Sequence, residues 1–213
     1  MNQEEYVATQ RNVNSLHMNG RQEAEFEEAI HHTRTFTSWL RAHDLPTESF
    51  LDSGCRTGYA MEELWRQYPA ARVVGVDIVP EFITVADKRG EAVVGDMQAL
   101  PFEDEEFDWT FSCTSIEHCP DIPAAVAEMQ RTSRYGFYVH TDLEDDKAFA
   151  KNPSHFAHHE DPDGWLAAFS HPEWWIVYLN VPRNNRVEMI WMRKQYAKQF
   201  LIKEDAPHAD LLR

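Results

Sequence analysis

The chain has 213 residues, 43% of them apolar, which suffices for one domain with a full hydrophobic core and leaves little room for a second. Its 36 acidic residues outnumber its 20 basic residues and give a net charge of −16. Because an acidic protein is poorly suited to displace the counterions of a polyanion, we expect neither a nucleic-acid partner nor an anionic membrane surface as a partner.

The cysteines and the apolar runs indicate where the protein works. Cys55, Cys113 and Cys119 are odd in number and lack paired C-x-x-C spacing, so we expect no disulfide framework, no zinc knuckle and a reducing, cytoplasmic location. No basic-then-apolar signal sequence opens the chain. The longest plainly apolar run, from Trp174 to Leu179, is too short to span a bilayer.

The N-terminal part is predicted to be an arm followed by a helix. Residues 1–20 are polar, and two interpretations remain open: an arm that folds over a ligand, or a frayed terminus. From Arg21 to His43, apolar residues recur at helical spacing behind an acidic first stretch that suits the positive end of a helix dipole. We predict a helix there, ending before Pro46.

A glycine-containing loop follows a short apolar run at Phe50–Asp52 and leads into another predicted helix. Glycine is needed where the backbone takes a positive φ or where a ligand comes too close for a Cβ atom, so Gly54 and Gly58 indicate a ligand site. The buried face of the predicted helix would carry four apolar residues at three-to-four-residue spacing. These are Met61, Leu64, Trp65 and Tyr68.

Two aspartates that end apolar runs indicate which ligand fits. Asp77 lies 19 residues after Gly58, near the spacing expected for a carboxylate that binds ribose hydroxyls, and Asp96 lies another 19 residues on. Neither the dinucleotide fingerprint nor the P-loop is present, although both serve to bind phosphates. A ligand with a ribose and no phosphates fits this pattern best.

The rest of the chain alternates between predicted strands and helices, which is typical of a parallel sheet with helices on both faces. Prolines stop one helix at Pro69 and begin the next at Pro80, and Asp121 caps a third. Asp161 opens a short helix with Trp165 and Phe169 inward. The further strands are predicted at Phe107–Cys113, Tyr135–Thr141, Trp174–Val181 and Arg186–Arg193, the last two joined by a hairpin turn at 182–185.

Four ordered segments resemble the successive motifs of class I S-adenosylmethionine-dependent methyltransferases, closest to the small type 11 group. The resemblance covers about residues 48–142, and its segments are 51–58, 74–78, 95–102 and 107–112. It implies a Rossmann-like, seven-stranded, mostly parallel sheet with an antiparallel C-terminal hairpin. It also implies S-adenosylmethionine as cofactor, with S-adenosylhomocysteine as its product, and an N-terminal helix beside the cofactor pocket.

The same resemblance implies roles for particular residues. Asp77 would bind the ribose hydroxyls, Ile78 would line the adenine, and Asp96 with the Met97 backbone would meet the adenine amino edge. The alternative is that both aspartates only cap turns after strands. The full set expected at the cofactor is Asp52, Gly54, Cys55, Arg56, Gly58, Asp77, Ile78, Asp96, Met97 and Cys113.

Arg56 departs from the family pattern, because members usually carry glycine at this position. Three interpretations are open: its guanidinium pairs with the carboxylate of the cofactor's methionine part, or it leans out to solvent, or it fills the cofactor volume. The third would leave a catalytically silent relative that binds a nucleoside or a protein partner.

Methyl transfer needs little chemistry from the protein, because the sulfonium brings its own leaving group. The protein mainly holds the acceptor in near-attack geometry and excludes water, so a general base is optional. If the acceptor is a hydroxyl, His118 is the first candidate base, although its motif also resembles a family element that shapes the methionine end. His140 and Asp142, at the end of the fifth strand, are acceptor-side candidates by position only.

No metal site is expected. His155 and His159 would share one face of a helix, but Pro153 and Pro162 favour a loop, so a lid that carries substrate-pocket histidines is the preferred interpretation. The expected organisation is one methyltransferase domain over residues 1–213. Within it, 1–45 form the arm and helix, 48–142 the cofactor core, and 143–213 the acceptor-side lid, helix and closing strands.

The expected function is methyl transfer to a small-molecule acceptor. A nucleic-acid amino-methyltransferase would be expected to carry an Asp/Asn/Ser-Pro-Pro-aromatic box after the fourth strand, and residues 114–118 are not one. A nicotinamide dehydrogenase would need the missing glycine pattern. The remaining alternative is the catalytically silent relative.

Overall fold

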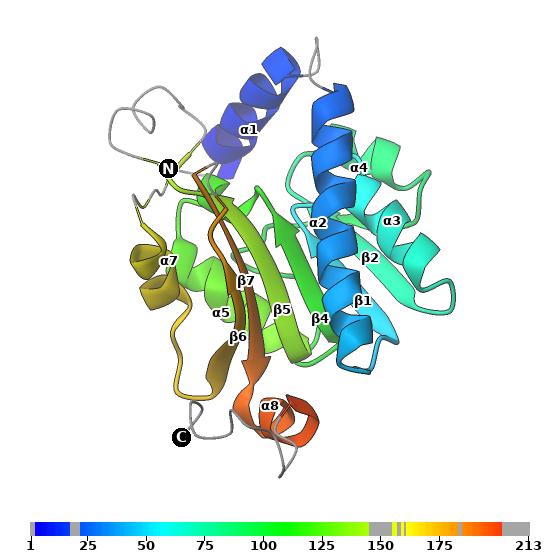
Figure 1. The fold of residues 1–213 in the computed structure, drawn as a ribbon. Helices are drawn as coiled ribbons and strands as arrows, with labels where there is room; N and C mark the ends of the chain where they lie inside the picture. Colours follow the sequence, from blue (N-terminus) through cyan, green and yellow to red (C-terminus); the bar gives the residue numbers. More distant parts are fainter. Residues whose placement is uncertain are drawn as a thin grey trace.

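The computed structural model describes residues 3–17, 22–144, 155, 156, 159, 161–182 and 185–201. Seven strands form one sheet in the order β3-β2-β1-β4-β5-β7-β6 (Figure 1). The strands are β1 Ser49–Ser53, β2 Arg72–Asp77, β3 Glu91–Val94, β4 Phe107–Cys113, β5 Ser133–Asp142, β6 Trp174–Asn180 and β7 Arg186–Arg193. Strands β1 to β5 pair in parallel, and β7 runs antiparallel to both β5 and β6. The predicted fold class is confirmed.

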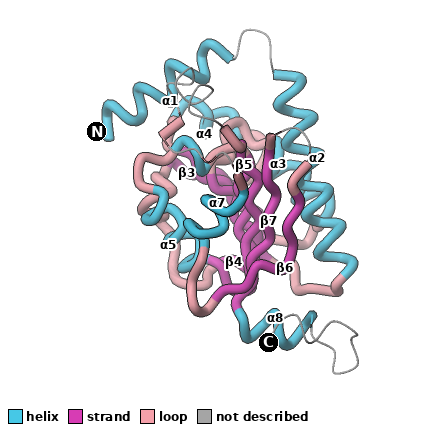
Figure 2. The backbone as a smooth tube through the Cα atoms, turned by 60° about the vertical axis from the view of Figure 1, so that its left-hand side comes forward, coloured by secondary structure: helices cyan, strands magenta, loops and turns pink. Residues whose placement is uncertain are grey.

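Helices cover both faces of this sheet (Figure 2). They are α1 Gln3–His17, α2 Gln22–Ala42, α3 Tyr59–Gln67, α4 Pro80–Ala86, α5 Ile122–Thr132, α7 Pro162–Phe169 and α8 Lys194–Leu201, with a 3₁₀ turn η1 at Ile116–His118. Among the described helices, none combines the length and the hydropathy needed to cross a bilayer. The parts of the predicted lid at 145–154, 157, 158 and 160, and residues 183–184 of the predicted hairpin turn, lie outside the described residues.

Two apolar clusters hold the layers together. On one face, Phe36 and Leu40 of α2 pack against Phe50, Trp109 and Tyr138 of the sheet, all of them buried. On the other face, α5 and α7 close a second cluster in which Trp165 and Phe169 are fully buried, as predicted. Burying such aromatic side chains stabilises the fold by about 2–3 kcal/mol each, so the sheet edge that carries the polar residues rests on a rigid base.

Helices α5 and α7 begin with the aspartate caps that the sequence predicts. The Asp121 carboxylate accepts a hydrogen bond from the Ala124 amide at 3.1 Å, and the Asp161 carboxylate accepts from the Asp163 amide at 3.0 Å. Both helices carry proline in the first turn, where a missing amide hydrogen leaves no bond unmade.

Three local features differ from the sequence analysis. Trp65 was predicted to face the core and is 53% exposed, because the buried face of α3 is formed by Ala60, Met61, Glu63 and Leu64 and is turned away from Trp65. Residues 3–17 form helix α1, whose buried contacts come from Tyr6 and Gln10. That pair includes a polar residue, so hydrophobic periodicity did not reveal it. Helix α8 was not predicted at all.

Candidate functional site

The candidate site lies at the edge of the sheet where the parallel strands end. In Figure 1 this is the edge beneath α1, opposite α8. The register pairs Asp52 with Gly75 across β1 and β2, and Asp77 with Val94 across β2 and β3. Asp96 follows β3 by two residues, so the three predicted carboxylates come from the ends of three neighbouring strands. Ligands of open α/β sheets bind at this edge.

The loop after β1 contains two glycines whose backbone is in the left-handed conformation. Gly54 has φ +81° and Gly58 has φ +86°, in the left-handed region. A Cβ atom on Gly54 would lie 2.5 Å from the Ser115 side chain, which itself donates to the Gly54 carbonyl oxygen at 3.2 Å. The loop after β1 and the turn after β4 are therefore packed directly against each other.

Asp77 organises this loop through its backbone. One carboxylate oxygen accepts from the Arg56 amide and the other from the Val79 amide, both at 2.9 Å. Each oxygen retains a second lone pair, so the carboxylate can still accept from a ligand hydroxyl. Burial raises the pKa of Asp77 to about 6, against the opposing effect of these amides and of the Arg56 charge.

Asp52 is more deeply buried, with 2% of its surface exposed. Burial, and then the neighbouring Asp77 carboxylate, raise its pKa to about 8. One of its oxygens has no hydrogen-bond partner among the described residues. An unpaired buried carboxylate beside another carboxylate favours a cationic ligand, because a positive charge would stabilise both ionised forms.

The structure places the other predicted cofactor residues around this edge. Asp96 accepts from the backbone amide and the side-chain amide of Gln98, each at 2.9 Å. Met97 is buried, and its methyl group would lie 3.2 Å from a Cβ atom on Gly54. Ile78 is half-buried. Cys55 is buried between α3 and α4, so its backbone rather than its thiol faces the edge of the sheet.

Arg56 adopts φ +50°, in the left-handed region that favours glycine. A left-handed conformation costs about 1–2 kcal/mol for a residue with a Cβ atom. The Arg56 guanidinium carbon lies 5.7 Å from the centre of the Phe82 ring, on α4. The side chain therefore extends toward α4, while the backbone amide remains bound to Asp77.

Tyr6 of α1 is a site residue that the sequence analysis missed. Its hydroxyl lies 3.8 Å from the Cys119 sulfur, and its ring packs edge-on against Phe156 at 5.9 Å. Burial raises its pKa first of all, and the charges of Cys119, Asp96 and Asp77 add to that effect. Helix α1 thus brings a buried phenol against the turn after β4.

The ends of β4 and β5 carry the predicted acceptor-side residues. Cys113 and His140 are paired in register, and the Cys113 sulfur lies 3.6 Å from His140 Nδ1. His140 is fully buried, and its Nε2 has no hydrogen-bond partner among the described residues. Burial and then the nearby His32 lower the pKa of His140 to about 3. In this state His140 is a weak base, which counts against its predicted role.

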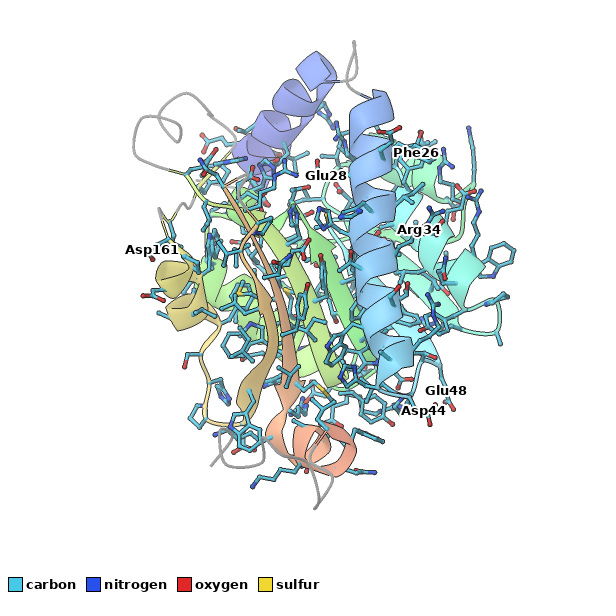
Figure 3. The ribbon with its side chains drawn as sticks, in the orientation of Figure 1. Phe26, Glu28, Arg34, Asp44, Glu48 and Asp161 are labelled. Carbon is cyan, nitrogen blue, oxygen red and sulfur yellow. The ribbon has the colours of Figure 1, made fainter. Side chains whose placement is uncertain are left out.

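His32 of α2 completes this group and was missed from the sequence. Its ring stacks on that of His140 with centroids 3.6 Å apart, and its Nδ1 lies 2.8 Å from a Glu188 carboxylate oxygen. Glu28, one turn earlier on α2, is turned toward β5 and β7 (Figure 3) and contacts Arg186. Arg186 also pairs with Asp142 at 3.0 Å. A charged, histidine-rich wall therefore lies between α2 and the antiparallel end of the sheet.

His118 ends η1, beyond the turn that contacts Gly54. Its carbonyl oxygen accepts from the Gln10 side chain of α1 at 3.4 Å. Its ring lies 4.6 Å from that of His155. The structure thus brings His118 together with a histidine of the predicted lid and separates it from His140, which packs on α2.

The comparisons with known proteins agree with this geometry. Residues 51–139 match the family model described as a methyltransferase domain. A malonyl-[acyl-carrier protein] O-methyltransferase of Serratia marcescens is 38% identical over 94 residues, which make up 43% of this chain and 36% of that protein. A demethylmenaquinone methyltransferase of Roseiflexus castenholzii is 37% identical over 91 residues, 40% of this chain and 38% of that protein. The chain thus spans little more than a third of the length of these relatives.

Solved structures show the same fold over more of the chain. One chain in the complex between the Haloferax volcanii Trm112 methyltransferase activator and a methyltransferase superposes with a TM-score of 0.68 at 15% identity, covering 84% of this chain and 96% of that chain. The matched residues 51–139 contain the glycine loop and all three carboxylates of the candidate site. Residues 51–139 thus match a methyltransferase domain, in agreement with the sequence motifs that resemble class I S-adenosylmethionine-dependent methyltransferases, and the superposed structure shows the same fold.

Proposed function

We propose that the chain transfers the methyl group of S-adenosylmethionine to a small-molecule acceptor. The observation that carries the proposal is the pair Asp52 and Asp77, two carboxylates with raised pKa values beside a loop that has no room for a Cβ atom at Gly54. A nucleoside that carries a sulfonium and an ammonium group supplies both the hydroxyls and the positive charge that such a site favours.

In this proposal each residue has a binding or positioning role. Asp77 accepts from the ribose hydroxyls, Ile78 lines the adenine, and Asp96 with the Met97 backbone meets the amino edge of the adenine. Asp52 lowers the energy of the positive charge at the methionine end. When bound, the cofactor supplies an electrophilic methyl group with its own leaving group. The protein's contribution is to hold the acceptor oxygen, nitrogen or carbon in line with that methyl group and to exclude water.

The acceptor would lie partly against residues outside the matched domain. The two relatives above are named for different acceptors, so the shared stretch does not select one. In this chain the wall formed by Glu28, His32, His140, Arg186 and Glu188 faces the same end of the sheet as Cys113. Such a wall favours a polar acceptor over a purely apolar one.

A second candidate function rests on Arg56. An arginine at φ +50° replaces the usual glycine in the cofactor loop, and this substitution suits a silent relative that binds a nucleoside or a protein without transferring a methyl group. Turnover separates the two candidates. Only the first requires both binding of S-adenosylhomocysteine and consumption of S-adenosylmethionine when an acceptor is present.

The first experiment is calorimetric titration of the protein with S-adenosylmethionine and with S-adenosylhomocysteine. We expect saturable binding of one molecule of each per chain. Adenosine triphosphate serves as the control ligand and is expected not to bind, because the loop lacks the phosphate-binding pattern of a P-loop. The absence of affinity for both sulfur-containing ligands would refute the proposed function.

The raised carboxyl pKa values predict that binding depends on pH. The folded, ligand-free protein holds these protons with pKa values of about 8 for Asp52 and about 6 for Asp77, against 3.8 for an ordinary aspartate. A cationic ligand favours the ionised forms, so binding releases protons and affinity rises with pH. From pH 8 to pH 5 we expect affinity for S-adenosylmethionine to fall by more than tenfold, because only about a tenth of Asp77 is ionised at pH 5 and Asp52 becomes protonated over the same range.

The stability of the ligand-free protein is expected to change in the opposite direction. Between about pH 4 and pH 8 the folded state binds these protons more tightly than the unfolded state, so the free energy of unfolding falls as pH rises. Titrations in buffers of different ionisation enthalpy, together with urea unfolding, measure both trends. Asp52→Asn should remove the part of each pH dependence that lies near pH 8. An affinity that is constant from pH 5 to pH 8 would contradict the assignment of these carboxylates.

A further inference from the structure

A cluster of carboxylates and imidazoles lies at the acceptor end of the site. We call it the Glu117 cluster, and its members are Glu117, His118, Asp142, Glu144 and His155. They come from η1, from the end of β5 and from the segment that leads to α7. The methyltransferase chemistry proposed above uses none of them except His118 and Asp142, and those only as candidates.

Backbone hydrogen bonds assemble this cluster from distant parts of the chain. The Phe156 amide donates to the Glu117 carbonyl oxygen at 2.8 Å, and the Glu144 amide donates to the His159 carbonyl oxygen at 2.9 Å. These bonds fasten the segment after β5 onto the turn after β4. His155 is consequently buried beside η1, with 8% of its surface exposed.

The distances within the cluster suit a single ion. One ligand atom each from Glu117, His118 and His155 lies within 4.8 Å of the others, and the same holds for Asp142, Glu144 and His155. The His118 and His155 rings meet at an interplanar angle of 76°. Because nitrogen lone pairs lie in the ring planes, rings at a large angle can serve as neighbouring ligands of one ion after small side-chain movements.

The surrounding contacts orient the ligand atoms. A Glu144 carboxylate oxygen lies 2.7 Å from His155 Nδ1, a contact that orients the imidazole ring. One Glu117 oxygen accepts from the Thr141 hydroxyl at 3.0 Å. The other is buried and has no hydrogen-bond partner among the described residues. Metal-binding carboxylates are commonly held in this way, with one oxygen bonded to the protein and one directed at the ion.

Electrostatics supply an independent reason for a cation. Glu117 is 1% exposed, and the Asp142 and Glu144 carboxylates belong to the same cluster. Like charges that crowd together in a buried place are stabilised when a divalent ion lies between them.

A second group with metal-ligand atoms is less suitable. Glu28, His32 and His140 also place ligand atoms within 4.8 Å of one another. The two rings are stacked, however, with an interplanar angle of 23°, so their in-plane lone pairs run nearly parallel and do not meet at one point. Glu28 moreover contacts Arg186, a cation that the fold already provides.

We propose that Glu117, His118 and His155 bind one divalent transition-metal ion, with Asp142 in reach as a further ligand. Two imidazoles and a carboxylate suit ions of the manganese, iron, cobalt and zinc class better than magnesium or calcium, which prefer oxygen ligands. Three protein ligands leave coordination positions open, as catalytic metal sites require and structural zinc sites do not.

The position of the cluster suggests what the ion does, and this part rests on the proposed function. Glu117 lies two residues after Ser115, whose hydroxyl bonds to the Gly54 carbonyl of the cofactor loop. An acceptor hydroxyl bound to the ion would lose its proton to water more easily. Its oxygen would then form the bond to the methyl carbon, and the carbon–sulfur bond would break with its electron pair remaining on sulfur.

The test is metal binding itself, measured without any acceptor. Chelator-treated protein is titrated with CoCl₂ and followed by visible absorption, and ZnCl₂ is then added to displace the cobalt. We expect one Co²⁺ per chain. Glu117→Gln and His155→Ala should each weaken Co²⁺ binding at least tenfold, whereas His171→Ala, at an exposed histidine outside the cluster, should bind as the unmodified protein does.

Two further measurements keep the outcome decisive. His140→Ala tests the competing group, and loss of Co²⁺ binding in that variant with retention in His155→Ala would overturn the assignment. Failure of the unmodified protein to bind Co²⁺ or Zn²⁺ would also overturn it. S-adenosylhomocysteine is titrated into every variant, because retained binding shows that the variant is folded and separates failure of the metal proposal from failure of the proposed function. Thermal unfolding should show stabilisation by Zn²⁺ in the unmodified protein and not in His155→Ala.

Discussion

Gly54→Ala is expected to destabilise the protein by roughly 2–5 kcal/mol, the sum of a left-handed backbone with a Cβ atom and an overpacked contact. The new Cβ atom would lie 2.5 Å from the Ser115 side chain, on a backbone at φ +81°. Relief requires movement of the turn after β4 away from the loop after β1. Because that movement would also displace Ser115 from the Gly54 carbonyl, we expect S-adenosylhomocysteine binding to be lost as well.

Urea unfolding measures the change in stability, and Gly90→Ala provides the matched control. Gly90 is exposed, its backbone is not in the left-handed region, and a Cβ atom there would meet only the end of the flexible Met61 side chain at 3.3 Å. That variant should unfold within about 1 kcal/mol of the unmodified protein. A Gly54→Ala protein that is as stable as the Gly90→Ala protein would show that the loop relaxes freely and that its tight packing is not required.

Asp77→Ala is expected to weaken the binding of S-adenosylhomocysteine by about 100-fold, which corresponds to about 3 kcal/mol and to the loss of one or two hydrogen bonds to a charged group. The substitution also leaves the Arg56 and Val79 amides without their acceptor. Part of the loss will therefore come from a loosened loop. Asp77→Asn, which keeps the shape and one acceptor oxygen, should weaken binding less.

The ribose assignment can be separated from general damage to the site. Methylthioadenosine contains the ribose and lacks the amino-acid part, so its binding should weaken to the same extent as that of S-adenosylhomocysteine. Asp87→Ala, at an exposed aspartate just after α4, is the control and should leave both dissociation constants unchanged. Calorimetric titration of Asp77→Ala, Asp77→Asn and Asp87→Ala with each ligand gives the dissociation constants to be compared. Equal affinities in the Asp77→Ala and unmodified proteins would refute the role assigned to Asp77.

Helix α1 links the cofactor edge to the rest of the site. Its Arg11 pairs with Glu81 of α4 at 3.0 Å, and its Gln10 reaches the His118 carbonyl oxygen. The helix thus connects α4, which follows β2, with η1, which follows β4. Of the two interpretations left open for the N-terminal segment, the structure supports the arm over the site, since residues 3–17 are helical and docked.

Residues that act through their local backbone could be recognised from the sequence. Gly54 and Gly58 were recognised because a left-handed turn restricts the residue type at one position, and the structure has φ values of +81° and +86° there. Asp77 and Asp96 were recognised because they end apolar runs, and the ends of parallel strands fall on one edge of a sheet. The prediction that Trp65 is buried was wrong, because the elements that pack against a helix decide which of its faces is buried, and the spacing of its apolar residues does not.

The sequence by itself determined the class of sheet, the edge at which the candidate site lies and the glycines of the loop after β1, because each follows from short-range backbone geometry and from the alternation of strands and helices. Only the tertiary structure decided what surrounds that edge. Tyr6 reaches Cys119, His32 stacks on His140, and His155 meets His118 through contacts between segments far apart in the chain. No local pattern specifies such contacts, since they depend on how helices and loops dock on the finished sheet.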